Sequence, residues 1–273
     1  LLQHLIGNHH QSRYKQELYE LYPDISSVVG RTTSSVASVF QRLEKEVKSR
    51  ALRVKTKSSR IQSHHESLGP IFTIGDYDFE VVKDLIYLGS EVTSDNNIGV
   101  EIKRRILLAN RCLFSLIRLL RSKQLSRKTK VRLYHQLILP VLLYGSESWT
   151  LTSADVKLLS AYERRVLRLI FFGAVCINGE WRIRYNQELY ELYNHPDIVK
   201  KIRTRRLRWA GHVERMDDNA AKKIYNASVE GVRRRGRQKA RWVDLVQKDV
   251  KELRIPSWKS TARNRELWAT YCC

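Results

Sequence analysis

The sequence predicts a mainly α-helical chain of the α+β class. A small β hairpin should lead into a helical bundle, and a basic helical region should follow it. Apolar residues recur at helical spacing along most of the chain from Ile98 onward, and short β-prone runs precede residue 90. The chain has 273 residues, of which 42% are hydrophobic, and this is enough to build a folded core.

The charge of the chain points to a polyanionic partner. Its formal net charge is +22 and its pI is about 10.1, values typical of proteins that bind RNA or DNA. An anionic membrane surface is the weaker alternative, and no apolar run approaches the roughly 20 residues that a spanning helix needs. The only methionine is Met216 and no signal peptide is recognisable, so we interpret the sequence as part of a longer reading frame.

The cysteines predict neither a metal site nor a bound cofactor. Cys112, Cys176, Cys272 and Cys273 have no partner Cys or His at the spacing of zinc ligands. Scattered thiols are typical of a reducing compartment. We therefore expect an intracellular protein and, with a nucleic acid as its partner, a nuclear one.

One segment of the chain occurs twice. Residues 13–25 repeat residues 184–198 almost completely, except that Asn194 and His195 are missing from the first copy. Copies this far apart do not form a solenoid. We interpret residues 1–30 as a displaced partial copy that lacks the packing neighbours of the original, and we expect this segment to be poorly ordered.

The region before the bundle is predicted to hold one helix and several short strands. Apolar residues at three- and four-residue steps predict a helix with one buried face: Val36, Val39, Phe40, Leu43 and Val47. The β-prone runs Ile71–Ile74 and Phe79–Val82 flank Gly75–Asp78 and predict a hairpin. A further run, Leu85–Leu88, predicts a strand that ends at Gly89.

Residues 98–175 are predicted to form a compact helical bundle. Its first helix carries a continuous apolar stripe: Ile102, Ile106, Ala109, Leu113, Leu116, Ile117 and Leu120. Ser126 is a candidate N-cap for a second helix, which Pro140 should interrupt. Ser153 is a candidate N-cap for a third helix, whose inward positions are Val156, Leu159, Tyr162, Val166 and Ile170.

Residues 176–273 are predicted to form a basic, helical nucleic-acid-binding region. Two apolar seams give this region its core. The modest seam consists of Ile198, Ile202, Ala210 and Val213, and the stronger one of Trp242, Val243, Leu245, Val246 and Val250. Tryptophans are more often core anchors than platforms for bases, and Trp209, which arginines surround, is the candidate exception.

The stretch Lys201–Trp242 is the predicted binding site for nucleic acid. A guanidinium group can donate two hydrogen bonds to one phosphate, and aromatic rings beside such groups can contact the bases of a nucleic-acid strand. The candidate contacts to the RNA or DNA backbone are Arg203, Arg205, Arg206, Arg208, Trp209, His212, Arg233, Arg234, Arg235, Arg237, Lys239 and Arg241. The alternative is a solvated charged face, but such a face usually mixes signs, and acidic residues are few in this stretch.

Several motifs resemble the C-terminal part of a non-LTR retrotransposon endonuclease/reverse transcriptase. They are Ile86–Ser90, Glu101–Ile106, Pro140–Trp149, Arg184–Tyr193, Arg206–Val213 and Gly236–Trp242. The resemblance implies that residues 31–97 correspond to the edge of the palm, in which Tyr87, Leu88 and Gly89 form a primer-grip-like segment. It also implies that residues 98–175 correspond to the thumb, which follows the template–primer duplex. Asn264 stands where the family favours aspartate, so we expect the local helix cap to be lost.

The resemblance does not extend to a catalytic site. Polymerases of this kind hold two metal ions about 3.5–4 Å apart with aspartates, some of them from an aromatic-Ala-Asp-Asp turn. The one Asp-Asp pair of this chain, Asp217-Asp218, follows Arg215-Met216 in a polar context. We therefore predict no catalytic residue, no metal ligand and no polymerase activity.

Three hypotheses about function remain open. In the first, the chain is a truncated reverse-transcriptase remnant that keeps template/primer-type nucleic-acid binding without catalysis. In the second, it is a host-adopted, sequence-tolerant DNA- or RNA-binding module. In the third, it is a structural helical protein whose charge only aids solubility. Salt-dependent binding separates the first two hypotheses from the third.

Overall fold

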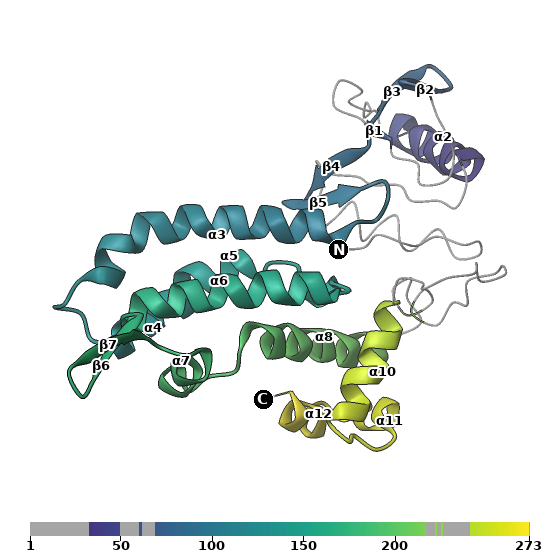
Figure 1. Cartoon of the computed structure of the whole chain (residues 1–273). Coiled ribbons are helices and arrows are strands. Elements are labelled where there is room, and N and C mark those ends of the chain that lie inside the picture. Colours follow the sequence, from purple (N-terminus) through teal and green to yellow (C-terminus); the bar gives the residue numbers. More distant parts are fainter. Residues whose placement is uncertain are drawn as a thin grey trace. The chain divides into compact units, whose positions relative to one another are not determined.

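The computed structural model describes residues 33–49, 60–61, 69–216, 222, 225 and 241–272 (Figure 1). Within these ranges the chain is mainly helical with small β hairpins, which confirms the predicted fold class. Contacts divide the chain into two compact units, and the larger one is built from Tyr87–Glu91, Asn97–Arg215 and the described part of Val232–Cys273. The segment predicted to be poorly ordered, residues 1–30, lies outside the described residues.

The smaller unit contains α2 (Thr33–Ser49), β1 (Arg60–Ile61), β2 (Ile71–Ile74) and β3 (Tyr77–Val81). The three strands pair in the order β1-β3-β2, and β2 and β3 form the predicted antiparallel hairpin. Its turn is shorter than predicted because Tyr77 already pairs with Ile74, and Gly75 supplies the positive φ of 61° that a tight turn requires. The ring of Phe40 is buried and packs edge-on against Phe79, with the ring centres 5.0 Å apart, and Val36 and Val39 of the predicted face are half-buried. The side chains of Leu43 and Val47 lie outside the described residues.

The strands β4 (Asp84–Tyr87) and β5 (Ser90–Thr93) form a separate two-stranded sheet that leads into α3 (Ile98–Arg121). Asn97 caps α3 by accepting a hydrogen bond from the backbone N–H of Gly99 at 3.1 Å. The predicted stripe of α3 lies inward, with Ile102, Ala109, Leu113 and Leu120 almost completely buried. Helix α3 therefore forms one side of the bundle.

Helix α4 (Arg127–Leu133) begins at the predicted cap, because the hydroxyl of Ser126 accepts a hydrogen bond from the N–H of Thr129 at 3.1 Å. Pro140 does not end the helical stretch that begins with α4. The chain widens into one π-helical stretch, η1 (Tyr134–Ile138), and continues as α5 (Leu139–Leu142). Proline has no N–H to bond four residues back, and the wide turn, in which Leu139 bonds to Tyr134, accommodates this loss.

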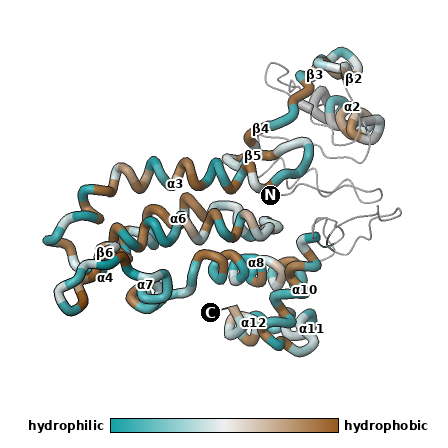
Figure 2. The backbone as a smooth tube through the Cα atoms, viewed as in Figure 1, coloured by the Kyte–Doolittle hydropathy of each residue, from teal (hydrophilic) through white to brown (hydrophobic). Residues whose placement is uncertain are grey.

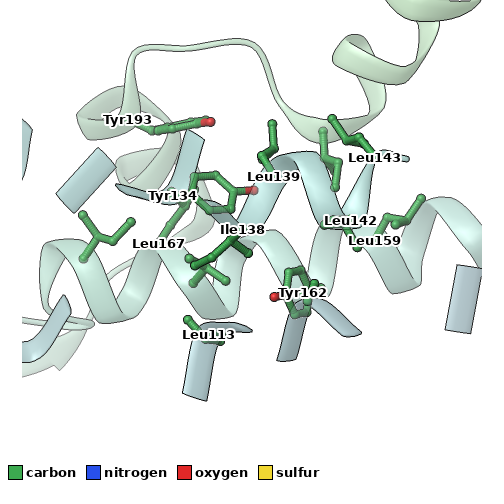
Figure 3. Close-up of a cluster of buried hydrophobic side chains, with 14 of the residues drawn as sticks. Leu113, Tyr134, Ile138, Leu139, Leu142, Leu143, Leu159, Tyr162, Leu167 and Tyr193 are labelled. Atoms are coloured by element: carbon green, nitrogen blue, oxygen red, sulfur yellow. The ribbon is translucent and has the colours of Figure 1, made fainter. Parts of the chain in front are cut away.

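Helix α6 (Ser153–Phe171) completes the core of the bundle. Its cap is Thr152 rather than the predicted Ser153, because Thr152 and Asp155 form a reciprocal capping box. The predicted inward residues Leu159, Val166 and Ile170 are fully buried. Figure 3 shows how the apolar side chains of this helix meet those of α3 and of the segment from Tyr134 to Leu143.

A hairpin after α6 was not predicted. Its strands are β6 (Ala174–Ile177) and β7 (Glu180–Ile183). The signal was present in the sequence, since Asn178-Gly179 is a dipeptide typical of a tight hairpin turn. Both residues have positive φ, 50° and 88°, as such a turn requires.

The C-terminal part of the larger unit contains α7 (Asn186–Tyr193), α8 (Ile198–Arg215), α10 (Trp242–Glu252), α11 (Trp258–Arg263) and α12 (Arg265–Tyr271). Helix α7 and the start of α8 pack in the core of the bundle, whereas α8 from Leu207 onward forms a second core with the later helices. The predicted seams are buried at Ala210, Val246 and Val250, and Trp268 is a core anchor with 3% of its surface exposed. The expected loss of a cap is wrong, because Asn264 caps α12 through the N–H of Leu267 at 3.0 Å.

The helices of the described ranges are amphipathic rather than apolar throughout (Figure 2). None of them carries an apolar stretch long enough to cross a lipid bilayer.

Candidate nucleic-acid interface

A short segment between α5 and α6 receives hydrogen bonds from several distant parts of the larger unit. This segment, Leu143–Trp149, contains the 3-10 turn η2 (Ser146–Ser148), and we call it the 143–149 loop. Arg205 donates to the carbonyl of Leu143 at 2.6 Å, and Arg206 donates to that of Trp149 at 3.1 Å. The indole N–H of Trp242 donates to the carbonyl of Glu147 at 2.7 Å. The basic C-terminal helices are therefore attached to this loop.

The primer-grip-like turn bonds to the same loop. The hydroxyl of Tyr144 donates to the carbonyl of Leu88 at 2.8 Å, and Arg104 donates to the carbonyl of Gly89 at 2.7 Å. Arg105 also donates to the carbonyl of Gly89. Leu88 and Gly89 both have positive φ, 46° and 79°, which matches a tight hairpin turn but is uncommon for leucine.

Ion pairs with Glu101 hold the donors Arg104 and Arg105 in place. Arg105 is 6% exposed and pairs with Glu101 at 2.5 Å, while its guanidinium carbon lies 4.4 Å from the centre of the Tyr144 ring. The other carboxylate oxygen of Glu101 accepts from the N–H of Glu91 at 2.7 Å. Three of the motifs that carry the resemblance therefore meet at one turn, and the role of Tyr87, Leu88 and Gly89 in binding a primer remains a prediction.

Two of the candidate arginines on α8 are neutralised by carboxylates. Arg206 is 3% exposed, and its guanidinium bonds to Asp249 at 2.6 and 2.9 Å. Arg203 bonds to Glu252 at 2.6 Å and lies 3.7 Å from Asp249. The burial of Arg206 removes it from the surface that a nucleic acid could reach, so its role in this structure is to join α8 to α10.

Two other arginines on α8 are held by neutral groups. Arg205 donates to the carbonyl of Leu143, and Arg208 donates to the carbonyl of Cys272 at 2.8 and 3.2 Å. A carbonyl orients a guanidinium without neutralising its charge, and neither arginine forms an ion pair with another of the described residues. Trp209, which is 36% exposed, and His212 follow at helical spacing, with their ring centres 5.2 Å apart. These four residues form one surface, which we call the outer face of α8.

The remaining candidates lie near the beginning of α10. Arg241 is exposed and precedes the helix, where its N–H donates to the carboxylate of Asp244 at 3.1 Å. Arg233, Arg234, Arg235, Arg237 and Lys239 lie outside the described residues, as do Asp217 and Asp218. Within the described ranges, no group of three or more His, Cys, Asp or Glu side chains could hold a metal ion.

A buried carboxylate joins α6 to the helices that follow it. Glu163 is fully buried, and it accepts hydrogen bonds from the N–H of Ile198 at 3.0 Å, from Tyr190 at 3.2 Å and from Tyr134 at 3.4 Å. Burial raises the pKa of Glu163, while the hydrogen bond from Ile198 opposes the rise. Sequence reasoning did not single out this residue, although its position beside Leu159, Tyr162 and Val166 placed it on the inner face of α6.

A second polar cluster surrounds the hydroxyl of Tyr193. His135 Nε2 lies 2.7 Å from this hydroxyl, and Lys201 donates to it at 2.6 Å. Burial, together with the charges of Lys201 and His195, lowers the pKa of His135 to about 4. Burial also lowers the pKa of Lys201. This cluster connects η1, α7 and α8, and therefore fixes the start of the helix that carries the basic residues.

Comparison with known proteins adds one relative and no fold template. The chain is 28% identical over 198 residues to a Caenorhabditis elegans protein named as an uncharacterized, transposon-derived protein. The similarity covers 68% of this chain and 69% of that protein. No protein-family model matches the chain. No solved structure matches it either.

Proposed function

We propose that the chain is a nucleic-acid-binding segment derived from the reverse transcriptase of a non-LTR retrotransposon. It binds RNA or DNA with little regard to sequence, through the outer face of α8 and the arginine-rich segment that precedes α10. It does not polymerise on its own. The polymerase origin, the binding and the lack of catalysis are all parts of this proposal.

The observation that carries the proposal is the hydrogen bonding of Arg205 and Arg208 to neutral backbone carbonyls. Backbone carbonyls orient both guanidinium groups without neutralising them, so the outer face of α8 holds fixed positive charge. Phosphate groups are suited to such donors, because a guanidinium can bond two phosphate oxygens at once. Trp209 offers part of its ring beside them, and an exposed ring can stack on an unpaired base.

The origin in a reverse transcriptase is supported by the meeting of three motifs. The motifs around Gly89, Arg105 and Tyr144 are far apart in the sequence, yet they join at one hydrogen-bonded turn. Contacts between motifs so far apart in the chain are consistent with a fold that was inherited as a whole. The description of the relative as transposon-derived is consistent with the same origin.

A structural role is the second candidate, because Arg203 and Arg206 are used inside the protein. If all the arginines of α8 acted in this way, the charge would serve only packing and solubility. The host-adopted module is a variant of the main proposal, and stable expression of the protein in its source organism would favour it.

Salt dependence of binding tests the proposal. The logarithm of affinity for duplex DNA should fall with the logarithm of salt concentration, with a slope of about −0.9 for each phosphate contacted. Arg208→Gln keeps a donor for the carbonyl of Cys272 but removes the charge, and it should flatten the slope by about 0.9. Arg203→Gln is the matched control. It removes an arginine charge from the same helix, but this charge is already neutralised by carboxylates.

Equal slopes for the wild type, Arg208→Gln and Arg203→Gln would contradict binding by the outer face of α8. Affinity that does not respond to salt at all would favour the structural role. Primer extension on an RNA template with magnesium or manganese, above that of a mock preparation, would contradict the non-catalytic part of the proposal.

A further inference from the structure

A groove with a volume of about 640 Å³ lies between α3 and α6 of the larger unit, where the two helices run side by side (Figure 1). The α3 side of the groove presents Asn110, Phe114, Ile117 and Arg121, whose spacing of four, three and four residues places them on one helical face. The α6 side presents Arg165 and Arg168. The groove is separate from the outer face of α8.

An aromatic ring without cover lies in this groove. Phe114 is 77% exposed, although phenylalanine is among the residues most often buried in proteins. On the same helix, Leu113 and Leu120 point into the core and are 3% and 0% exposed. Helix α3 is therefore anchored to the core by other residues, and the outward position of Phe114 is not the result of a poorly packed helix. The exposed ring offers a flat face of the kind on which a nucleic-acid base stacks.

The charge around this ring is positive and uncompensated. Arg121 and Arg165 are exposed, and neither forms an ion pair with another of the described residues. Arg168 donates to the side-chain oxygen of Asn186 at 2.8 Å, and this neutral partner orients the guanidinium without cancelling its charge. No acidic residue occurs in the sequence from Asn110 to Arg121 or from Arg164 to Leu169.

These features together favour a strand that carries both negative charges and flat rings. The groove is also lined by Leu113, Ile117 and Leu169, but Phe114 is the exposed one among its apolar residues, and three arginines line the groove with it. A partner helix would need a broader exposed apolar stripe. The bases of a duplex are paired and stacked, so their faces are closed to Phe114. An unpaired strand can place a base on the ring and its flanking phosphates on the arginines.

We propose that the α3–α6 groove binds single-stranded nucleic acid, with one unpaired base against Phe114 and phosphates against Arg121, Arg165 and Arg168. The inference rests on the proposed nucleic-acid binding, and it assigns a second site with a different preference. The ring and the guanidinium groups make no use of the sugar 2′-hydroxyl. RNA and DNA strands of the same base should therefore bind with similar affinity.

Fluorescence anisotropy with labelled oligo(dT), oligo(U) and a duplex of the same length, each of about 12 nucleotides, tests the groove. Phe114→Ala should weaken binding of both single strands roughly 5- to 150-fold, the loss expected for one base stack, and leave duplex affinity unchanged. Phe114→Tyr, which keeps the ring, should restore single-strand affinity. Leu119→Ala is the matched control, because Leu119 is 46% exposed on another face of α3.

Charge removal gives an independent measurement. The double variant Arg121→Gln, Arg165→Gln should flatten the salt slope on single strands by about 1.4, which corresponds to two phosphates. Thermal midpoints near that of the wild type should accompany all these variants, since the substituted side chains are exposed.

The possible failures can be told apart. If the wild type binds neither single strands nor duplex, both the proposed function and the groove site are wrong. If it binds with a clear salt slope but Phe114→Ala leaves single-strand affinity unchanged, only the groove site is wrong. If a polyglutamate peptide displaces the strand as well as unlabelled oligo(dT) does, the groove is a general anion surface and the base-stacking assignment is overturned.

Discussion

The indole ring of Trp268 lies directly against Gly211. A Cβ atom built on this glycine would lie 2.1 Å from Nε1 of the indole and 2.4 Å from its Cδ1. The ring is held there by the hydrogen bond from Nε1 to the carbonyl of Leu207 at 3.0 Å. A glycine in the middle of α8 is therefore required for close packing of α8 against α12.

Gly211→Ala should destabilise the larger unit, because overpacking a core costs about 1–3 kcal/mol and a contact at 2.1 Å favours the upper end of this range. The intrinsic preference of alanine for helix acts in the opposite direction, by roughly 1 kcal/mol. A fall in the thermal midpoint would measure the net effect. Gly173→Ala is the control, because its added Cβ would meet Arg168 at an ordinary 3.5 Å, and a variant as unstable as Gly211→Ala would contradict the explanation.

Arg206→Ala should reduce the free energy of unfolding by about 3–5 kcal/mol, because it leaves the buried carboxylate of Asp249 with a weaker partner. Arg203 lies 3.7 Å from that carboxylate and offsets part of the loss, so the lower end of the range is expected. Urea denaturation of Arg206→Ala, Asp249→Ala and the double variant measures the coupling. Additive losses would show that the pair does not act as a unit.

Stability should depend on pH through Glu163. Its pKa is raised in the folded protein, so the folded state holds the proton more tightly than the unfolded state does. The stabilisation is complete below the unfolded pKa of about 4.3 and is lost as the pH rises through the raised pKa. Glu163→Gln should remove this loss, and identical pH profiles for variant and wild type would contradict it.

His135 should act with the opposite sign. Its pKa is lowered to about 4 in the folded protein, so its contribution to stability is complete above the ordinary value of 6.5 and is lost as the pH falls through 4. His135→Gln places a neutral amide near the hydroxyl of Tyr193. The double variant Glu163→Gln, His135→Gln should lose less thermal stability than Glu163→Gln alone when the pH falls from 6.5 to 4. Thermal midpoints measured across this pH range test the prediction.

The arginines that precede α10 should contribute to binding but not to stability. Changing Arg233, Arg234, Arg235 and Arg237 to alanine should flatten the salt slope on duplex DNA by about 3 to 4, which is close to 0.9 for each lost contact. The effect should be similar for unrelated sequences, because phosphates carry no sequence information. A slope that the four substitutions leave unchanged would assign these residues to a solvated face.

Much of the fold could be predicted because helical periodicity is a local signal. The stripe on α3, the cap at Ser126 and the seam through Ala210 followed directly from spacing. The Asn178-Gly179 hairpin was missed although its signal is equally local. The missing N–H of Pro140 predicts a disturbance of the helix, but it does not say whether the helix ends there or widens into the π-helical turn that the structure contains.

The candidate site was less predictable than the fold, because the number of arginines says nothing about their partners. Arg206 and Arg208 are two residues apart and look alike in the sequence. Asp249 neutralises the first, whereas a neutral carbonyl of Cys272 holds the second. Both partners come from segments more than 40 residues away in the chain, and only the folded structure distinguishes the two roles.

The 143–149 loop also waits for partners that are synthesised much later than the loop itself. The hydrogen bond from Trp242 to Glu147 spans 95 residues, and ribosomes add about 5–20 residues per second. The loop therefore leaves the ribosome roughly 5–20 s before its last donor. Contacts of this span slow folding, so the larger unit should fold more slowly than a chain of local helical hairpins of the same length.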